Sequence, residues 1–272
     1  MRIIWLDETD CQNVKITGGK ASALSRLAAR YPVPPGFCIA AGALDGSIAK
    51  AYGALGEMSK TENPAVAVRS SATDEDGMEA SFAGQYDTYL NIVGENRVID
   101  AARRCFESAR SDRVAAYRSA HEKKDDNPDI VVFVQLLVKT DVSAVVFSVN
   151  PVDGNRDEII INSNWGLGES IVSGIVTPDT YIISKPDLGI KERRAAFKTR
   201  MTIPDPGGTG SVEKAIPRVM ASSLSMTDAQ AVETARLALK LEKESGFAVD
   251  VECGWKNEKL YLLQCRPVTT RI

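Results

Sequence analysis

Two acidic side chains, an amide and a guanidinium occupy alternating positions near the C-terminal end of the sequence. One stretch runs from Ala248 to Trp255, a second runs from Leu260 to Pro267, and the polar residues 256–259 between them are typical of a hairpin turn. Side chains of a strand point alternately to its two faces. One face is therefore predicted to carry Asp250, Glu252, Gln264 and Arg266. The opposite face is predicted to enter a core with Val249, Val251, Tyr261, Leu263 and Cys265.

This combination of side chains suits magnesium and phosphate. Mg²⁺ takes oxygen ligands, usually one or two carboxylates together with substrate phosphates, and arginine presents a fork that matches phosphate oxygens. The alternative is a surface hairpin with a solvated charged face, which antiparallel sheets often show. Alternation alone does not separate these two interpretations.

A second candidate site for binding an anion lies near the N-terminus, where Gly18-Gly19-Lys20 precedes the helix-favouring residues 21–30. Helix N-termini attract anions through free N–H groups and the helix dipole. The prolines of residues 31–36 end this predicted helix, because proline cannot continue one. The alternative is a structural turn, since the Walker pattern is absent.

The segment from Val66 to Ser70 is predicted to be a short strand, followed by a loop over 71–84 that is rich in small, acidic and glycine residues. Arg69 at the end of this strand could grip a phosphate, or could pair with the acidic residues after it. The Ser81–Thr88 segment could cover phosphates, because glycine lets backbone N–H groups approach an anion. The alternative interpretation of this segment is a plain loop that leads into a strand.

Two further polar residues interrupt apolar or glycine-rich segments. Gln135 lies within the apolar strand predicted over 130–138 and could read an adenine edge, or could be an edge-facing side chain of a half-buried strand. Glu169 ends Asn164-Trp-Gly-Leu-Gly-Glu and could bind ribose or orient metal-bound water, or could cap the following helix. His121, the single histidine, is expected to be exposed and inert, which excludes a histidine-rich metal site.

Strands and helices are mixed along the chain, which predicts α+β lobes rather than a regular parallel sheet. A helix over 227–245 is expected to begin with a capping box of Thr227 and Gln230 and to end at Gly246. A third predicted helix, besides the one after Lys20, covers most of 95–123. Further strands are expected at the N-terminus and at 87–92, 144–149, 158–162 and 181–184, with a flexible turn over 204–210.

Composition places few limits on function. The 272 residues are 44% hydrophobic and 25% charged with a formal net charge of −3, and no basic block suggests a nucleic-acid surface. No stretch is apolar enough to span a bilayer, and no signal peptide is recognisable. Five scattered cysteines without a CxxC pair predict reduced thiols in a cytoplasmic protein, with Cys253 and Cys265 as core residues.

In this order, the segments resemble the N-terminal ATP-binding domain of the phosphoenolpyruvate synthase and pyruvate phosphate dikinase family, which rifampicin phosphotransferase and phenylphosphate synthase share. The resemblance runs from Gly-Gly-Lys through Pro-Pro-Gly-Phe, Val-Arg-Ser-Ser-Ala, Ser-Phe-Ala-Gly-Gln-Tyr and Trp-Gly-Leu-Gly-Glu to Leu-Gln-Cys-Arg-Pro. It implies an ATP-grasp-like fold in which two lobes, roughly 1–125 and 126–272, close over Mg-ATP. In this family the phosphate passes to a histidine on a swivelling domain, and AMP and inorganic phosphate are released.

The resemblance also implies roles for individual residues. Lys20 and Arg69 would hold phosphates, and the loop from Gly84 through Gln85 to Thr88 would cover them, with Thr88 near the phosphate that moves. Gln135 would face the adenine and Glu169 would lie near the nucleotide. Glu252 and Gln264 would ligate Mg²⁺. Arg266 would neutralise developing charge, and Lys20 and Arg69 would act with it in catalysis.

Two departures from the family pattern shape the functional hypothesis. The interval between Phe37 and Val66 is shorter than usual, so a small helical insert is expected to be missing. The sequence stops soon after Pro267, so the histidine domain and the substrate barrel are expected on a partner or elsewhere in a longer enzyme. The alternatives are a non-catalytic nucleotide-binding module that regulates a partner, and an ATP-grasp ligase that releases ADP.

Overall fold

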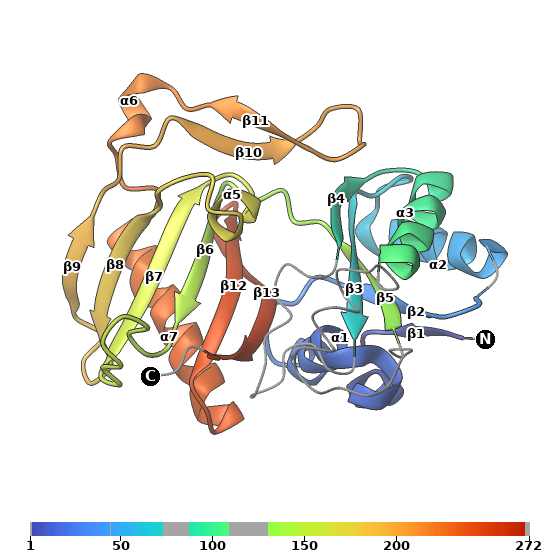
Figure 1. Cartoon of the computed structure of the whole chain (residues 1–272), viewed down its shortest axis with the longest axis horizontal. Coiled ribbons are helices and arrows are strands. Elements are labelled where there is room, and N and C mark those ends of the chain that lie inside the picture. Colours follow the sequence, from blue (N-terminus) through green and yellow to red (C-terminus); the bar gives the residue numbers. More distant parts are fainter. Residues whose placement is uncertain (1, 44, 73–86, 109–129, 270–272) are drawn as a thin grey trace. The chain divides into compact units, whose positions relative to one another are not determined.

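The computed structural model describes residues 2–43, 45–72, 87–108 and 130–269 (Figure 1). It is a mixed α+β structure, as predicted, and it divides into two compact units. The first unit comprises residues 1–137 and 205–211, and the second comprises 138–204 and 212–272. The strand over 130–136 belongs to the first unit, so the division falls later in the chain than the boundary expected near residue 125. Over the described residues, no helix is long and apolar enough to cross a membrane.

The first unit is built on an antiparallel sheet of the strand order β1-β2-β5-β3-β4. Its central strands β5 and β3 are buried along almost their whole length, as their apolar sequences predict. The strands are β1 Ile3–Trp5, β2 Gly36–Ala40, β3 Val66–Ala72, β4 Thr88–Ile92 and β5 Ile130–Leu136. The helices are η1 Thr9–Gln12, α1 Val14–Ala28, α2 Asp45–Ser59 and α3 Glu95–Ser108.

The two faces of this sheet differ in what covers them. One face packs against α2 and α3 in a continuous apolar core, to which the sheet contributes Phe37, Ile39, Val66, Val68, Val132 and Val134. The opposite face carries the alternate residues of β3 and β5 and meets α1, because the Ser71 hydroxyl contacts the backbone of Thr17 and Ala21. The candidate residues of this unit thus lie on the face that apolar packing leaves available.

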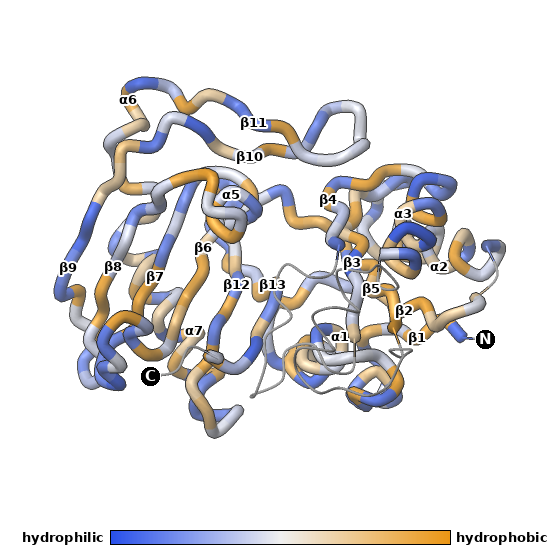
Figure 2. Tube along the Cα trace, in the orientation of Figure 1, coloured by the Kyte–Doolittle hydropathy of each residue, from blue (hydrophilic) through white to orange (hydrophobic). Residues whose placement is uncertain are grey.

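The second unit is built on an antiparallel sheet of the order β13-β12-β6-β7-β8-β9. Helix α7 covers one face, where the Trp255 indole donates to the Thr234 hydroxyl at 3.1 Å. The edge strand β9 is hydrophilic from its second residue onward, which suits an edge that faces solvent (Figure 2). The strands are β6 Val142–Phe147, β7 Glu158–Trp165, β8 Asp179–Ser184, β9 Ile190–Arg194, β12 Val249–Lys256 and β13 Lys259–Pro267. The helices are α5 Glu169–Val172, α6 Arg218–Ala221 and α7 Asp228–Ser245.

A separate two-stranded ribbon is formed by β10 Arg200–Pro204 and β11 Ser211–Ala215. The turn between these strands, residues 205–211, belongs to the first unit although the strands on either side continue the second. The sequence predicted the turn over 204–210 but did not predict either strand of the ribbon.

Helix α7 begins and ends as the sequence predicts. The Thr227 hydroxyl accepts from the Gln230 amide N–H while the Gln230 side chain accepts from the Thr227 N–H, which completes the capping box. Gly246 ends the helix with φ 75°, in the left-handed region that favours glycine.

The hairpin β12–β13 has the predicted turn, in which Asn257 and Glu258 both adopt positive φ. A β-bulge after Glu252 changes the predicted facing of β13. Cys253 pairs with Leu262, so that Leu260 and Leu262 enter the core and Tyr261 lies opposite Gly254. The prediction that Tyr261 and Leu263 face the core is therefore wrong, because the extra residue reverses the alternation.

Other predictions meet different outcomes. Helix α2 lies in the interval between Phe37 and Val66, to which the sequence analysis assigned no helix or strand. All five cysteines are free and buried, in agreement with the expectation for Cys253 and Cys265. The 71–84 loop beyond Ala72, the helix beyond Ser108 and His121 lie outside the described residues.

Candidate functional site

The Gly18-Gly19-Lys20 segment breaks α1 and restarts it. Gly18 has φ 75° and ψ 174°, so the helix continues afresh from Gly19 as the sequence predicts. A Cβ atom at Gly18 would lie 2.3 Å from the Ser71 carbonyl oxygen. Ser71 in turn donates to the Thr17 carbonyl at 2.8 Å and accepts from the Ala21 N–H at 3.3 Å. Ser71 therefore fixes the turn that precedes Lys20. This positioning role was not predicted from the sequence.

The register of the sheet brings three more candidate residues to this face. Arg69 lies opposite Thr88 on β4 and opposite Phe133 on β5, and two residues along β5 Gln135 lies opposite Ala67. Cross-strand partners share a face, and residues two apart on one strand do so as well. Arg69, Thr88 and Gln135 thus lie on the same face as Ser71, which anchors the turn before Lys20.

Arg69 and Ser70 each bury a polar atom that has no hydrogen-bond partner among the described residues: the Arg69 Nε and the Ser70 Oγ. A buried donor without a partner costs free energy. An anion on this face would satisfy the Arg69 Nε. The acidic residues proposed as an alternative partner, 74–76, lie outside the described residues, as do Gly84 and Gln85.

Gln135 is 2% exposed, and its Nε2 donates to the Pro34 carbonyl at 3.2 Å. Strand β5 lies between β2 and β3, so Gln135 is not the edge-facing residue of a half-buried strand that was considered as an alternative. Its backbone contact fixes the amide orientation at the end of a central strand.

In the second unit, the hairpin places its four polar residues as the alternation predicts. Asp250 lies opposite Arg266, and Glu252 lies opposite Gln264. The Arg266 Nε donates to Asp250 Oδ2 at 2.9 Å, which orients the guanidinium across the strands. Asp250 and Gln264 are only 7% and 5% exposed, so the interpretation as a fully solvated charged face is wrong for these two residues.

The oxygen atoms of this face match the needs of Mg²⁺. Glu252 and Gln264 are direct cross-strand partners, and Glu252 is half-buried. Among the described residues there is no cluster of three or more histidine, cysteine or acidic side chains that could hold a metal by themselves. This set fits Mg²⁺, because that ion usually completes its shell with water and substrate phosphates.

Glu169 lies on the same face of the second sheet as the hairpin residues. The Asn164 side-chain amide donates to the Ser170 hydroxyl of α5 at 3.1 Å. Asn164 lies opposite Ser143 on β6, and Ser143 lies opposite Gly254 on β12. Gly254 is two residues from Glu252 on β12 and therefore on the same face. Glu169 is the first residue of α5 and follows the N-cap Gly168, so both interpretations of this carboxylate stay predictions.

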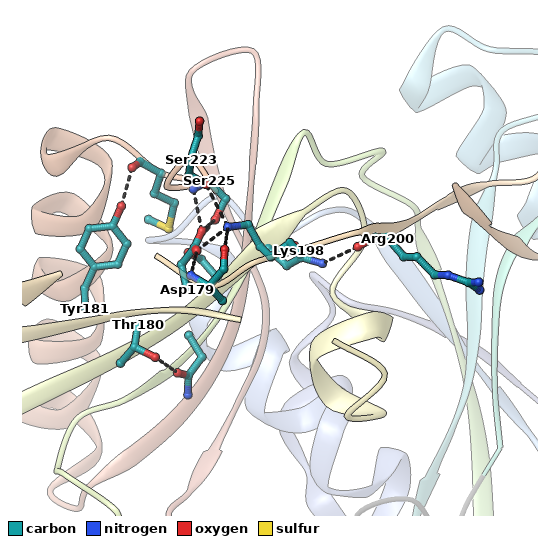
Figure 3. Close-up of polar contacts among 12 residues, drawn as sticks. Asp179, Thr180, Tyr181, Lys198, Arg200, Ser223 and Ser225 are labelled. Atoms are coloured by element: carbon teal, nitrogen blue, oxygen red, sulfur yellow. Dashed lines mark hydrogen bonds and ion pairs between the residues drawn. The ribbon is translucent and has the colours of Figure 1, made fainter. Parts of the chain in front are cut away.

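A buried ion pair that the sequence did not reveal lies on the opposite face (Figure 3). Lys198 and Asp179 both have fully buried side chains. The Lys198 ammonium donates to Asp179 Oδ1 and to the carbonyls of Ala196 and Ser223, which uses all three of its N–H groups. Asp179 also accepts from the Ala196 N–H and from the N–H and hydroxyl of Ser225. This saturated cluster joins the start of β8 to the connections before β10 and α7.

Comparisons with known proteins identify the family. Residues 41–272 match the family described as "Pyruvate phosphate dikinase, AMP/ATP-binding domain", and the chain belongs to this family. It is 36% identical to the probable phosphoenolpyruvate synthase of Methanocaldococcus jannaschii over 98% of its length, which covers 27% of that protein. It is 41% identical to the phosphoenolpyruvate synthase of Pyrococcus furiosus over 82% of its length, which covers 28% of that protein.

Similarity to solved structures is weaker. The D-alanine-D-alanine ligase from Coxiella burnetii matches 95% of this chain and 49% of its own with a TM-score of 0.43 and 11% sequence identity. The resemblance inferred from the motifs is confirmed by the family match, and the chain is an AMP/ATP-binding domain of the dikinase type.

Proposed function

We propose that this chain is the Mg-ATP-binding part of a dikinase-type phosphotransferase. It passes a phosphoryl group from ATP to a histidine on a separate domain or partner protein, and AMP and inorganic phosphate are released. The observation that carries the proposal is the hairpin register, which pairs Glu252 with Gln264 and Asp250 with Arg266 on one face.

Each candidate residue has a physical task in this proposal. The turn before Lys20 and the side chain of Arg69 offer N–H donors and positive charge to phosphate oxygens. The segment from Gly84 to Thr88, the first residue of β4, would cover them. The fixed amide of Gln135 faces the adenine, and Glu169 approaches the ribose. Arg266, oriented by Asp250, neutralises charge on the phosphoryl group that moves.

The metal has a defined place in the proposal. Glu252 and Gln264 would hold Mg²⁺, which supplies charge neutralisation on the phosphate oxygens when it is bound. Phosphoryl transfer depends mainly on positioning and charge stabilisation, so these two ligands and the cations named above account for the chemistry expected of this chain.

The phosphate acceptor is proposed to be a histidine outside this ATP-binding domain. The chain spans 27% and 28% of the two phosphoenolpyruvate synthases it matches, so their remaining length corresponds to other domains. A histidine on such a domain, in the same polypeptide or in a partner, would receive the phosphoryl group.

The test is to incubate the full chain with Mg²⁺ and either β- or γ-labelled ATP in soluble extract of its own cell. We expect a labelled protein from the β-label only, with AMP formed and with a label that survives alkali but not acid, as phosphohistidine does. Mg-ATP binding without labelled protein would support the non-catalytic module instead. ADP as the product would support a ligase.

The hairpin residues give the sharpest variants. Glu252→Gln removes a carboxylate with little change in volume, and we expect transfer to slow by about 100-fold or more, as for loss of one electrostatic contact to a transition state. Arg266→Lys keeps the charge and removes the fork, and should also slow transfer. Glu258→Gln, in the exposed turn of the same hairpin, is the matched control. Equal activity of Glu252→Gln and this control would exclude the proposed metal ligand.

A further inference from the structure

We infer that Cys11 and Cys38 form a redox modification site, in which a peroxide closes a disulfide between them and thereby weakens nucleotide binding at the neighbouring glycine turn. The disulfide itself is independent of the proposed function, whereas its effect on nucleotide binding rests on that function.

The geometry brings the two thiols together from separate elements. The Sγ atoms of Cys11 in η1 and Cys38 in β2 lie 4.0 Å apart, although 27 positions separate them in sequence. Both residues are 0% exposed. Cys38 lies opposite Phe133 and Ile4, which places it on the α1 face of the first sheet rather than in the apolar core under α2 and α3.

The contact assigns different parts to the two sulfurs. Hydrogen bonding by the Cys38 thiol lowers the pKa of Cys11 against the opposing effect of burial. The same contact, together with burial, raises the pKa of Cys38. Because the thiolate is the nucleophile in thiol chemistry, and because Cys11 lies on the short helix η1 whereas Cys38 is held within the sheet, we assign Cys11 as the attacking residue and Cys38 as the resolving residue.

The reaction needs hydrogen peroxide as the two-electron oxidant. The Cys11 thiolate attacks one peroxide oxygen, the O–O bond breaks, and the departing hydroxide takes up a proton to become water, which leaves a sulfenic acid on Cys11. The Cys38 sulfur then attacks the Cys11 sulfur, the S–O bond breaks, and the leaving hydroxide takes the Cys38 proton as a second water. The two thiols together lose two electrons and the peroxide gains them.

Closing the bond requires one element to move. A disulfide has an S–S length of about 2.05 Å, so the sulfurs must approach from their present 4.0 Å. Strand β2 is held between β1 and β5, whereas η1 is a four-residue 3₁₀ helix that takes no part in the sheet. The hydrogen bonds of short 3₁₀ segments have poorer geometry than those of an α-helix, and local opening of one segment costs less free energy than global unfolding. Opening of η1 would admit peroxide to the buried thiols, and η1 is the element that moves.

A chain of hydrogen bonds connects this movement to the glycine turn. The Thr17 hydroxyl donates to the Cys11 carbonyl at 2.6 Å, and the Thr17 carbonyl accepts from the Ser71 hydroxyl at 2.8 Å. Thr17 directly precedes Gly18, which packs against the Ser71 carbonyl. Displacement of Cys11 therefore displaces Thr17, the residue that directly precedes the turn before Lys20.

Two of the other cysteines provide internal controls. Burial raises the pKa of Cys105 to about 12, and burial likewise raises the pKa of Cys253 to about 12. Cys105 has the carbonyls of Val68 and Asp87 as hydrogen-bond acceptors at 3.8 Å. These thiols are expected to remain reduced under conditions that oxidise Cys11.

The first test maps the disulfide. The full chain is treated with hydrogen peroxide, its remaining thiols are alkylated under denaturing conditions, and its peptides are analysed by mass spectrometry. We expect a Cys11–Cys38 linkage that dithiothreitol reverses, in the native chain and in the control Cys105→Ser. In Cys38→Ser, dimedone should label Cys11 as a trapped sulfenic acid. A folded, peroxide-treated chain with both thiols still free, or with Cys11 linked elsewhere, would overturn the proposal.

The second test measures the affinity for Mg-ATP before and after oxidation. We expect the oxidised native chain to bind at least several-fold more weakly than the reduced chain, and Cys11→Ser to be unaffected by peroxide. Equal affinity of the two forms would overturn the coupling. Failure of the reduced native chain to bind Mg-ATP would overturn both the proposed function and the coupling, whereas the peptide map decides the disulfide separately.

Discussion

Lys198 and Asp179 show how a buried charge can be tolerated in the second unit. Isolated charges are strongly disfavoured in a protein interior, and a pair persists only when further hydrogen bonds satisfy the remaining donors and acceptors. Both conditions hold here, because every N–H of the Lys198 ammonium has an oxygen partner and Asp179 also accepts from Ala196 and Ser225. The cluster is therefore expected to hold the connections around β8 and α7 in place.

Removing one partner of this pair should be costly. Lys198→Met leaves the Asp179 carboxylate buried without its cation, and we expect the free energy of unfolding to fall by about 3–5 kcal/mol. Chemical denaturation measures this change. Arg193→Met, which removes one partner of the exposed Arg193–Asp228 pair, is the control and should cause a much smaller loss. Similar losses in the two variants would contradict a structural role for the buried pair.

Gly18 is a second position at which the contacts of a single atom, an added Cβ, are expected to change the free energy of unfolding. Gly18→Ala must adopt a positive φ and also place its Cβ against the Ser71 carbonyl, at 2.3 Å without rearrangement. Gly246 has the same φ of 75°, but its Cβ position is open, so Gly246→Ala tests the conformational cost alone, about 1 kcal/mol. We expect Gly18→Ala to lose more unfolding free energy than Gly246→Ala and, in addition, to lower Mg-ATP affinity in calorimetric titration. Equal losses of unfolding free energy in the two variants would show that the close approach of Gly18 to Ser71 does not contribute to stability.

At the scale of elements, Asn91 anchors the 205–211 turn within the first unit. Its Nδ2 donates to the carbonyls of Asp205 and Gly210 at 2.8 and 2.7 Å, and its own backbone has φ 54°. The Val93 N–H and the Arg97 guanidinium add contacts to the carbonyls of Gly208 and Gly207. The ribbon β10–β11 thus has its turn fixed by side chains that are more than 100 positions earlier in sequence.

Removing the Asn91 amide should loosen this turn locally. In Asn91→Gly, which accepts positive φ, the carbonyls of Asp205 and Gly210 each lose one of two donors and keep only the backbone N–H of the turn. We expect the amides of Asp205 and Gly208 to exchange about tenfold faster with deuterium. Hydrogen exchange followed by mass spectrometry measures this, and peptides from α7 serve as the internal control. Unchanged exchange in 205–211 would show that the backbone contacts alone hold the turn.

At the scale of the whole molecule, Glu158 links stability to acidic pH. Its carboxylate accepts from Asn150 Nδ2 at 2.9 Å and from Lys191 Nζ at 3.0 Å. The hydrogen bond from Asn150, followed by that from Lys191, lowers the pKa of Glu158. A lowered pKa in the folded state means that the charged carboxylate stabilises the fold above the ordinary glutamate pKa, about 4.3. This contribution is lost as the pH falls through the lowered folded-state value.

Glu158→Gln should remove this pH dependence. We expect the native chain to exceed the variant in unfolding free energy at neutral pH, and the difference to shrink as the pH falls below about 4.3. Denaturant titrations at several pH values between neutral and strongly acidic measure the difference. A difference that stays constant or grows on acidification would contradict the assignment.

Much of the candidate site was predictable because its signals are local. The alternation of Asp250 and Glu252 fixes their common face, and the two glycines before Lys20 mark the start of the helical segment that follows them. The helical turn that precedes Gly18 in α1 was not predicted. The capping box of α7 is local for the same reason, since its partners are three residues apart. Each of these predictions depends on backbone geometry over a few residues.

Other features escaped prediction because their partners are distant in sequence. The bulge after Glu252 turns Tyr261 away from the core, and no residue type marks its position. The burial of Lys198 depends on Asp179 and Ser223, which come from other elements. Ser71 looked like a loop residue, although it supports the turn at Gly18.

The sequence by itself therefore determined the family and the mixed α+β class, because these are carried by motif identity and short-range periodicity, and the nucleotide contacts that it nominates stay a prediction. Only the tertiary structure decided that Cys11 lies beside Cys38, that Asn91 holds the 205–211 turn, and which hairpin residues enter the core. The physical reason is that burial and pairing are properties of residues brought together by sheet register, and register is set by the sum of many weak contacts rather than by any local signal.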